Sequence, residues 1–310
     1  MKAVRIHEYG DEEVVRYEDA PRPEPAAGEV LVEVHAASVN PVDWKTRSGG
    51  GQADKIGEAF PVVLGWDLSG TVVEVGPDTS GPGVGDEVFG MPRFPQPGST
   101  FAEYVSAPAH ELALKPRTLS YVEAAALPLA GLTAWQALFE VGGLEAGQAA
   151  LVHAAAGGVG HLAVQLARSK GARVVGTASG QNADFLRSLG AEPVDYRVER
   201  FEEKVSDVDL VLVAVDGDVL ERSWQVLRPG GVLVSIRGEP SAEDAERHGV
   251  RAERILVHPD AGQLEQIAVR VDAGEVQPFV GAELPLAEVG KAFELSESGH
   301  TRGKIVLRVR

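Results

Sequence analysis

Cysteine is absent from this chain of 310 residues. Its absence excludes disulfides, zinc sites built from thiolates, cysteine nucleophiles and iron–sulfur clusters in one step. It also fits a reducing compartment. The first residues turn acidic from Glu8 onward and do not have the pattern of a signal peptide. We therefore expect a cytoplasmic protein.

Positive charge and long apolar runs are also scarce. The chain has 29 Lys and Arg against 46 Asp and Glu, which gives a formal net charge of −17. Such a chain repels phosphate backbones, so we expect no nucleic-acid partner. No run approaches the roughly 18 apolar residues that cross a bilayer, so we expect no membrane partner. The G-x-S-x-G and P-loop motifs are missing too, so neither serine hydrolysis nor phosphoryl transfer is indicated.

The length favours two domains, at roughly 150 residues per domain. Residues 1–118 contain short alternating or β-branched runs between Gly and Pro clusters, which is typical of a barrel-like or sandwich-like unit. The strands expected there are residues 30–34, 70–75, 87–89 and 101–105. Residues 262–310 have too few elements to fold alone, so we expect them to pack on this first domain.

Residues 119–261 alternate between helical and strand patterns. The expected helices are residues 121–127, 133–139, 159–169, 183–189 and 219–227, and the expected strands are residues 149–153, 173–177, 210–215 and 231–236. Runs of Val, Leu and Ala without alternation, joined by helices, indicate a parallel sheet covered on both faces. The chain is therefore predicted to be α/β. Two further helices (residues 263–271 and 286–295) and a last strand (residues 304–309) follow.

A glycine-rich turn joins the strand at residues 149–153 to the helix at residues 159–169. It fits the pattern A-x-G-x-x-G at Ala155, Gly157 and Gly160. Small residues here allow a tight turn, a close approach of a pyrophosphate to the backbone, and close packing of helix on strand. The amino terminus of the helix then offers N–H groups to the anion. The turn predicts a dinucleotide site, although such turns also occur for packing alone.

The next strand ends without the acid that commonly holds the adenine ribose of NAD. Its end reads Thr177-Ala178-Ser179-Gly180, and the first acid after the glycine-rich turn is Asp184. This favours NADP, with Ser179, Gln181 and Asn182 as possible donors to its 2′-phosphate. Because residues 177–182 contain no Lys or Arg, a plain turn explains them equally well.

Six segments together resemble a known family. They are ASVNPVDWK (37–45), GWDLSGTV (65–72), GDEVFG (85–90), GLTA (131–134), GGVG (157–160) and GHTRGKIVL (299–307). In this order they resemble the zinc-independent quinone oxidoreductases of the medium-chain dehydrogenase/reductase superfamily. The resemblance implies a GroES-like catalytic domain (residues 1–118 and 262–310), a Rossmann domain (residues 119–261) and an active cleft between them. It also implies NADPH as cofactor, and a homodimer or homotetramer whose Rossmann sheets pair edge to edge near residues 231–236.

The resemblance also assigns site residues. Asn40, beside nicotinamide and substrate, and Lys45 are the expected catalytic donors, with a turn residue and a solvated loop cation as the alternatives. Asp43, Trp44 and Phe94 are expected to shape the substrate pocket, although Trp44 could be core and Phe94 a loop anchor. Asp67 is expected to be a structural hydrogen-bond acceptor. The expected cofactor-binding residues are Asn40, Thr133, Ala156, Gly157, Gly158, Val159, Gly160, Thr177, Ser179, Tyr196, Val215, Ile236 and Arg237.

Zinc-containing relatives carry a G-H-E motif where this chain has Gly65-Trp66-Asp67, and their other ligand positions need cysteine. We therefore expect no metal. Without a Lewis acid, hydride transfer from NADPH to a quinone or an α,β-unsaturated carbonyl fits best, because the acceptor oxygen is conjugated to the reacting carbon. The alternative is a non-catalytic NADPH-binding protein, such as a redox sensor or a structural protein.

Overall fold

The computed structural model describes residues 1–310, and the chain divides into two compact units. The first unit comprises residues 1–132, 258–272 and 278–310, and the second comprises residues 133–257 and 273–277. The sequence placed the first boundary near residue 118. In the structure residues 119–132 belong to the first unit, where the Ser69 hydroxyl donates to the Tyr121 carbonyl.

The first unit is built mainly from antiparallel strands. They are β1 (Lys2–Ile6), β2 (Val15–Asp19), β3 (Glu29–Val39), β4 (Val62–Val63), β5 (Leu68–Val75), β6 (Glu87–Gly90), β7 (Tyr104–Pro108), β8 (Leu112–Leu114), β15 (Val280–Pro285) and β16 (Lys304–Arg308). A seven-stranded sheet has the order β15-β16-β3-β5-β6-β8, with β7 also paired to β3. A second sheet has the order β2-β1-β4. The chain's last strand thus lies beside β3, with Ile305 opposite Val39.

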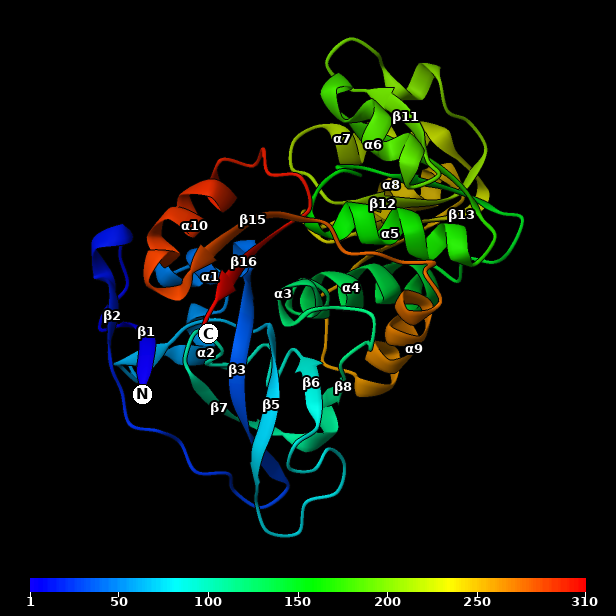
Figure 1. Ribbon diagram of the computed structural model, residues 1–310. Coiled ribbons are helices and arrows are strands. Elements are labelled where there is room, and N and C mark those ends of the chain that lie inside the picture. The colour runs from blue at the N-terminus through cyan, green and yellow to red at the C-terminus, as the bar shows by residue number, and fades with distance from the viewer. The chain divides into compact units, whose positions relative to one another are not determined.

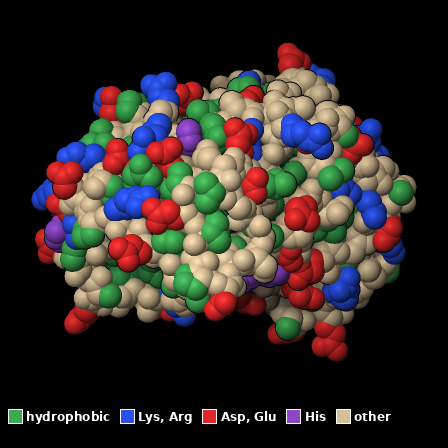
Figure 2. All heavy atoms as spheres, turned by 60° about the horizontal axis from the view of Figure 1, so that its bottom comes forward, with side chains coloured by type: hydrophobic (Ala, Val, Ile, Leu, Met, Phe, Trp, Pro, Cys, Tyr) green, Lys and Arg blue, Asp and Glu red, His purple; other side chains and the backbone are tan.

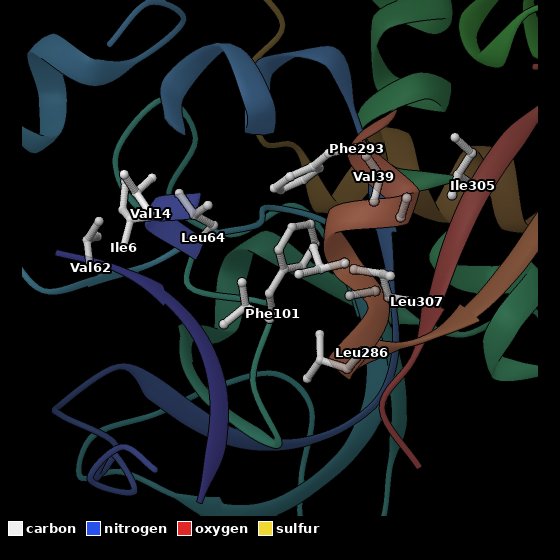
Figure 3. Packing of buried hydrophobic residues seen from close by; sticks show 14 of the residues in the cluster. Ile6, Val14, Val39, Val62, Leu64, Phe101, Leu286, Phe293, Ile305 and Leu307 are labelled. Atoms are coloured by element: carbon white, nitrogen blue, oxygen red, sulfur yellow. The ribbon is translucent and has the colours of Figure 1, made fainter. Parts of the chain in front are cut away.

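The first unit also contains five helices. They are α1 (Pro41–Arg47), α2 (Ala53–Ile56), α3 (Tyr121–Ala125), α9 (Ala261–Asp272) and α10 (Val289–Glu297). Of these, α1, α2 and α10 contribute side chains to its largest hydrophobic core. Phe101 and Phe293 lie at the centre of this core, with ring centroids 6.3 Å apart. Figure 3 shows the two rings between Leu64 on one side and Val39 and Leu307 on the other. The core therefore joins segments from both ends of the sequence.

The second unit contains a six-stranded parallel sheet. Its strands are β9 (Ala149–Val152), β10 (Arg173–Ala178), β11 (Glu192–Asp195), β12 (Val208–Val213), β13 (Leu227–Ser235) and β14 (Arg251–Arg254), and its helices are α5 (Gly158–Ser169), α6 (Ala183–Ser188), α7 (Val219–Ser223) and α8 (Ala242–His248). The strand order is β11-β10-β9-β12-β13-β14. This is the doubly wound order of a dinucleotide-binding fold. Figure 1 shows β11, β12 and β13 of this sheet together with α5, α6, α7 and α8. The predicted α/β class with a parallel sheet is confirmed.

Several elements differ from the sequence prediction. Residues 41–47, for which no helix was predicted, form α1, because Pro41 occupies the first helical position behind the cap residue Asn40. The helix expected at residues 133–139 begins earlier, as α4 (Pro128–Trp135), and continues as a wider π-type turn. β14 and β15 were not predicted. β14 is short and polar, and β15 contains Gly281 and ends at Pro285, so neither carries a strong strand pattern.

The surface carries charges of both signs. In Figure 2 the Lys and Arg side chains of the face shown are interspersed with Asp and Glu and do not form one basic patch. No helix of the chain is long and apolar enough to cross a membrane.

Candidate active site

The glycine-rich turn of the second unit leaves the amino terminus of α5 open. The chain leaves β9, passes through Ala154 at a φ of +50°, and enters α5 at Gly158. The cap residue Gly157 has no side chain that could accept hydrogen bonds from the first turn of α5. The N–H groups of that turn therefore keep their capacity to donate to a ligand. Together with the helix dipole, they make this end a site for a diphosphate.

Two glycines in this region are required by packing. A Cβ on Gly160 would lie 2.2 Å from the Ala154 carbonyl oxygen, and one on Gly176 would lie 2.7 Å from the Ala155 Cβ. Gly157 is different, because its Cβ would meet only the Ala154 oxygen, at 3.2 Å. Gly160 therefore lets the helix approach the strand, while Gly157 keeps the outer side of the turn free for a ligand. The residues present fit a dinucleotide.

A neutral buried histidine stands at the start of this turn. The His153 ring contacts the Thr177 hydroxyl through Nδ1 at 3.0 Å and the Ser223 hydroxyl through Nε2 at 3.1 Å. Burial, followed by the Arg222 charge, lowers the pKa of His153 to about 3. The ring is therefore uncharged at neutral pH and ties together the ends of β9 and β10 and the helix α7. The sequence analysis missed this residue.

The predicted adenosine end is assembled from β10 and β11. Thr177 and Ser179 are buried at the end of β10, and the Ser179 hydroxyl accepts a bond from Asn182 Nδ2 at 3.1 Å. The hydroxyl hydrogen of Ser179 therefore remains a donor. The Tyr196 amide donates to the Ala178 carbonyl at 3.2 Å, which sets this half-exposed tyrosine beside Ser179.

The cation that the sequence lacked at residues 177–182 comes from elsewhere in the chain. Arg187 lies in the same hollow as Ser179 and Gly180, and Arg197 directly follows Tyr196. Asp195 also faces this hollow, but its Oδ1 accepts the Arg197 amide at 3.0 Å. The hollow thus holds the Ser179 hydroxyl and one guanidinium, that of Arg187, beside the carboxylates of Asp195 and Glu199.

The other predicted cofactor residues follow the carboxyl ends of neighbouring strands. Val215 comes after β12, and Ile236 and Arg237 come after β13. The Arg237 guanidinium is paired with Asp216. Thr133 lies in α4 and is 5% exposed. Because parallel strands end at one edge of their sheet, Val215, Ile236 and Arg237 share that edge with the glycine-rich turn.

Asn40 occupies the junction between β3 and α1 in the first unit. It is the cap residue of α1, and its backbone N–H donates to Asp43 Oδ2 at 2.6 Å. Its side-chain Nδ2 donates to Asp67 Oδ2 at 2.8 Å and to the Ser38 carbonyl at 3.4 Å. The residue is 2% exposed. The carboxamide is thus already engaged inside the unit, and its role as a donor to substrate stays a prediction.

A buried lysine that the sequence analysis did not assign completes this cluster. Lys304 of β16 donates through Nζ to Asn40 Oδ1 and to the Val39 carbonyl. The same Nζ lies 3.6 Å from Asp67 Oδ2. The signal was present in the sequence as a charged residue in the otherwise apolar end of the GKIVL segment. It had no assigned partner, because residues 40, 67 and 304 meet only in the tertiary structure.

Asp67 is the hub of the cluster. Besides Asn40 and Lys304, it accepts the Ser38 hydroxyl at 2.6 Å and the Leu129 amide at 2.7 Å. These contacts agree with the expected role as a structural acceptor. Burial lowers the pKa of Lys304, with the Asp67 and Asp43 charges opposing that shift. Burial also raises the pKa of Asp43 well above its ordinary value, so both groups resist ionisation.

The remaining predicted pocket residues divide between helix and core. Lys45 is half-buried on α1, with its Nζ 5.4 Å from the centroid of the Trp44 ring. Trp44 packs against the core, and its indole donates to the Ser296 hydroxyl at 3.1 Å. The Phe94 ring is buried edge-on against Trp66, with centroids 5.5 Å apart, and so anchors its own loop. Asp43 is also fully buried, as the partner of the Asn40 cap.

No group of three or more His, Asp or Glu side chains is placed to hold a metal ion. Trp66 stands at the position of the histidine of the G-H-E motif. It is 2% exposed, and its indole donates to the Gln96 carbonyl at 2.7 Å. This position therefore packs a loop.

Comparisons with known proteins agree with this geometry. A family model described as "Alcohol dehydrogenase GroES-like domain" matches residues 26–117, and one described as "Zinc-binding dehydrogenase" matches residues 189–307. The 2-methylene-furan-3-one reductase of Solanum lycopersicum is 34% identical over 99% of this chain and 79% of its own length.

Two solved structures superpose over almost the whole chain. The quinone oxidoreductase from Coxiella burnetii is 39% identical, with a TM-score of 0.92 over 100% of this chain and 99% of its own. The Escherichia coli quinone oxidoreductase complexed with NADPH is 26% identical, with a TM-score of 0.88 over 99% of this chain and 100% of its own. The resemblance first seen in six short segments thus extends along the whole sequence and fold. The chain belongs to the zinc-independent quinone oxidoreductase family of the medium-chain dehydrogenases/reductases.

Proposed function

We propose that this protein is an NADPH-dependent reductase of quinones or α,β-unsaturated carbonyl compounds. The observation that carries the proposal is the amino terminus of α5, which has no side-chain cap. Together with the space left at Gly157, it suits the diphosphate of a dinucleotide. Relatives named for quinone reduction and for reduction of a 2-methylene-furan-3-one, an enone, support the substrate class. A relative of known structure holds NADPH.

The residues of the second unit would hold the cofactor. The α5 amino terminus would bind the diphosphate, while Ser179, Tyr196 and Arg197 would bind the 2′-phosphate. When bound, NADPH supplies a hydride to the electron-poor carbon of the acceptor. The acceptor then needs one proton, and hydrogen bonds to its oxygen favour the reaction. Lys45 is the ammonium that we assign to this oxygen, since the Asn40 carboxamide is engaged by its neighbours.

The test is the oxidation of NADPH followed at its nicotinamide absorbance with a panel of quinones and enones. We expect steady loss of absorbance with at least one acceptor, and weaker binding of NADH than of NADPH in a fluorescence titration. Tight NADPH binding without turnover on any acceptor would instead establish the alternative, a non-catalytic redox sensor or structural protein. Equal or better binding of NADH would contradict the cofactor assignment.

Lys45→Met tests the assigned donor. The variant is expected to lower kcat by about tenfold or more, because a charged donor to the developing oxyanion is lost, while NADPH affinity is kept. The control is Lys55→Met, which removes an exposed lysine of α2 in the same unit. Unchanged turnover in Lys45→Met would contradict the assignment of Lys45 as the donor to the acceptor oxygen. Asn40→Ala serves as the parallel test of Asn40.

We further propose assembly into a homodimer or homotetramer. The resemblance placed the pairing near residues 231–236, but β13 is an inner strand between β12 and β14. The edge strand next to β13 is β14, and open strand edges favour pairing between copies. Light scattering is expected to give two or four times the mass of the chain, and the mass of one chain would contradict the proposal. A cytoplasmic location stays a prediction of the sequence, to be tested by cell fractionation.

A further inference from the structure

We infer that Lys304 is a positioning residue, which fixes the junction of β3 and α1 through Asn40 and thereby places Lys45. The structural part of this inference stands on contacts within the first unit. Its consequence for turnover rests on the proposed function, in which Lys45 serves the acceptor oxygen.

The contacts run in sequence from Lys304 to Lys45. The Lys304 ammonium binds two successive residues at the junction, Val39 through its carbonyl and Asn40 through Oδ1. On its other side the Asn40 carboxamide donates to Asp67 at 2.8 Å. Its oxygen and its nitrogen therefore have different partners, which leaves the carboxamide one orientation. Lys45 lies on α1, little more than one turn beyond this cap residue.

The buried charges of this cluster favour a role in positioning residues over a role in stabilising the fold. Lys304 is 4% exposed, while Asp67 and Asp43 are fully buried, so three ionisable groups share the interior of the unit. Asp43 Oδ1 has no hydrogen-bond partner. Burial opposes the charged forms of Lys304 and Asp43 alike. A well-packed apolar cluster would commonly be at least as stable as a buried ion pair, whereas a buried ion pair specifies one arrangement.

A second buried lysine in the same unit supplies the contrast. The Lys115 side chain is 6% exposed, and its ammonium donates to the Leu119 carbonyl at 2.6 Å and lies 3.2 Å from the half-exposed Glu87 carboxylate. None of its contacts involves β3, Asn40 or α1. Lys115→Met is therefore a matched control, since it removes a buried ammonium without touching the junction.

The first experiment is independent of activity. In the full chain labelled with ¹⁵N, the Asn40 carboxamide signals are assigned by their loss in Asn40→Ala, and the Trp44 indole signal by its loss in Trp44→Phe. We expect Lys304→Met to shift both sets of signals and Lys115→Met to shift neither. If Lys304→Met does not fold, Lys304→Gln replaces it, because its amide removes the charge and shortens the reach. Unshifted Asn40 signals in a folded Lys304 variant would overturn the inference.

The second experiment measures coupling through Asn40, with 1,4-naphthoquinone as acceptor. We expect Lys304→Met to lower kcat by about tenfold to a hundredfold, with the KM for NADPH changed by less than about twofold. In an Asn40→Ala background the same substitution should change kcat by less than about twofold, since the residue through which it acts is gone. An equal loss in both backgrounds would show a merely structural role and overturn the inference. A wild-type protein without turnover would contradict the proposed function, while the Asn40 signals would still decide the positioning.

Discussion

The candidate functional residues of the first unit and those of the second unit are held in place by different kinds of interaction. In the first unit, buried charges on Asp67 and Lys304 hold Asn40 and the start of α1. In the second unit, backbone geometry at Gly157 and one uncharged histidine, His153, shape the turn. Backbone N–H groups with fixed positions can bind a phosphate-bearing ligand. A reacting oxygen needs a side-chain donor, and neighbouring residues must hold that side chain in place.

The difference has an energetic side. Buried ions cost free energy unless every partner is present, so the charged cluster is vulnerable to the loss of a single member. A neutral hydrogen-bonded histidine carries no such cost at neutral pH, although it must stay uncharged. The glycine-rich turn depends on space and has no charge to lose.

Removing the Lys304 charge should have the largest effect on stability. Lys304→Met leaves the Asp67 carboxylate buried without its cation, and we expect the free energy of unfolding to fall by about 3–5 kcal/mol. Urea unfolding followed by circular dichroism measures it. The double variant Lys304→Met/Asp67→Asn removes both charges and should recover much of the loss. A double variant as unstable as the single one would show that the charges do not form a pair.

Filling the turn should abolish binding without a comparable loss of stability. Gly157→Val places a branched side chain where the diphosphate approaches, and we expect NADPH to bind at least about a hundredfold more weakly, roughly 3 kcal/mol. A fluorescence titration measures it. Gly290→Val on α10, where a Cβ would meet nothing within 4 Å, is the control and should bind NADPH normally. Normal NADPH binding by Gly157→Val would show that the diphosphate does not bind at this turn.

Acid should test the neutral histidine. Because the pKa of His153 is lowered to about 3 in the folded protein, the unfolded chain takes up the proton first as the pH falls below its ordinary value of about 6.5. The stability contribution is therefore complete above about pH 6.5 and is lost progressively toward pH 3, by about 2 kcal/mol at pH 5.

His153→Gln is expected to remove this component, so that its thermal midpoint falls less steeply between pH 7 and pH 5 than that of the wild type. The variant starts from a lower stability at pH 7, because it disturbs the contacts with Thr177 and Ser223. His110→Gln, at an exposed position, should keep the wild-type steepness. An equally steep fall in His153→Gln would assign the acid sensitivity to other groups.

Removing one hydroxyl at the adenosine end should give the smallest effect. Ser179→Ala deletes a donor that the 2′-phosphate of NADPH would use, so NADPH should bind about threefold to tenfold more weakly, or about 1 kcal/mol. NADH lacks the phosphate, and its affinity should stay the same. Titration of both nucleotides against the same variant therefore contains its own control. Equal losses for both would show that Ser179 supports the fold of the turn instead.

Most of the second unit could be predicted from the sequence. Its four inner strands, β10, β9, β12 and β13, contain apolar runs, and the Gly157 to Gly160 turn is local, so spacing along the chain reports geometry in space. The adenosine end could be predicted only in part, because Arg187 reaches it from the neighbouring helix α6. α1 was missed because a helix of seven residues has too few turns to show a period.

The sequence by itself determined the parallel sheet, the dinucleotide turn and the lack of cysteine ligands, because each of these depends on composition or on residues close together in the chain. Only the tertiary structure decided what surrounds Asn40. Lys304 reaches it because β16 pairs with β3 across most of the sequence, and Asp67 reaches it from the start of β5. Burial then makes the pairing of Lys304 with Asp67 necessary, because a lysine that folding removes from water needs a partner for its charge, whereas an exposed lysine is hydrated.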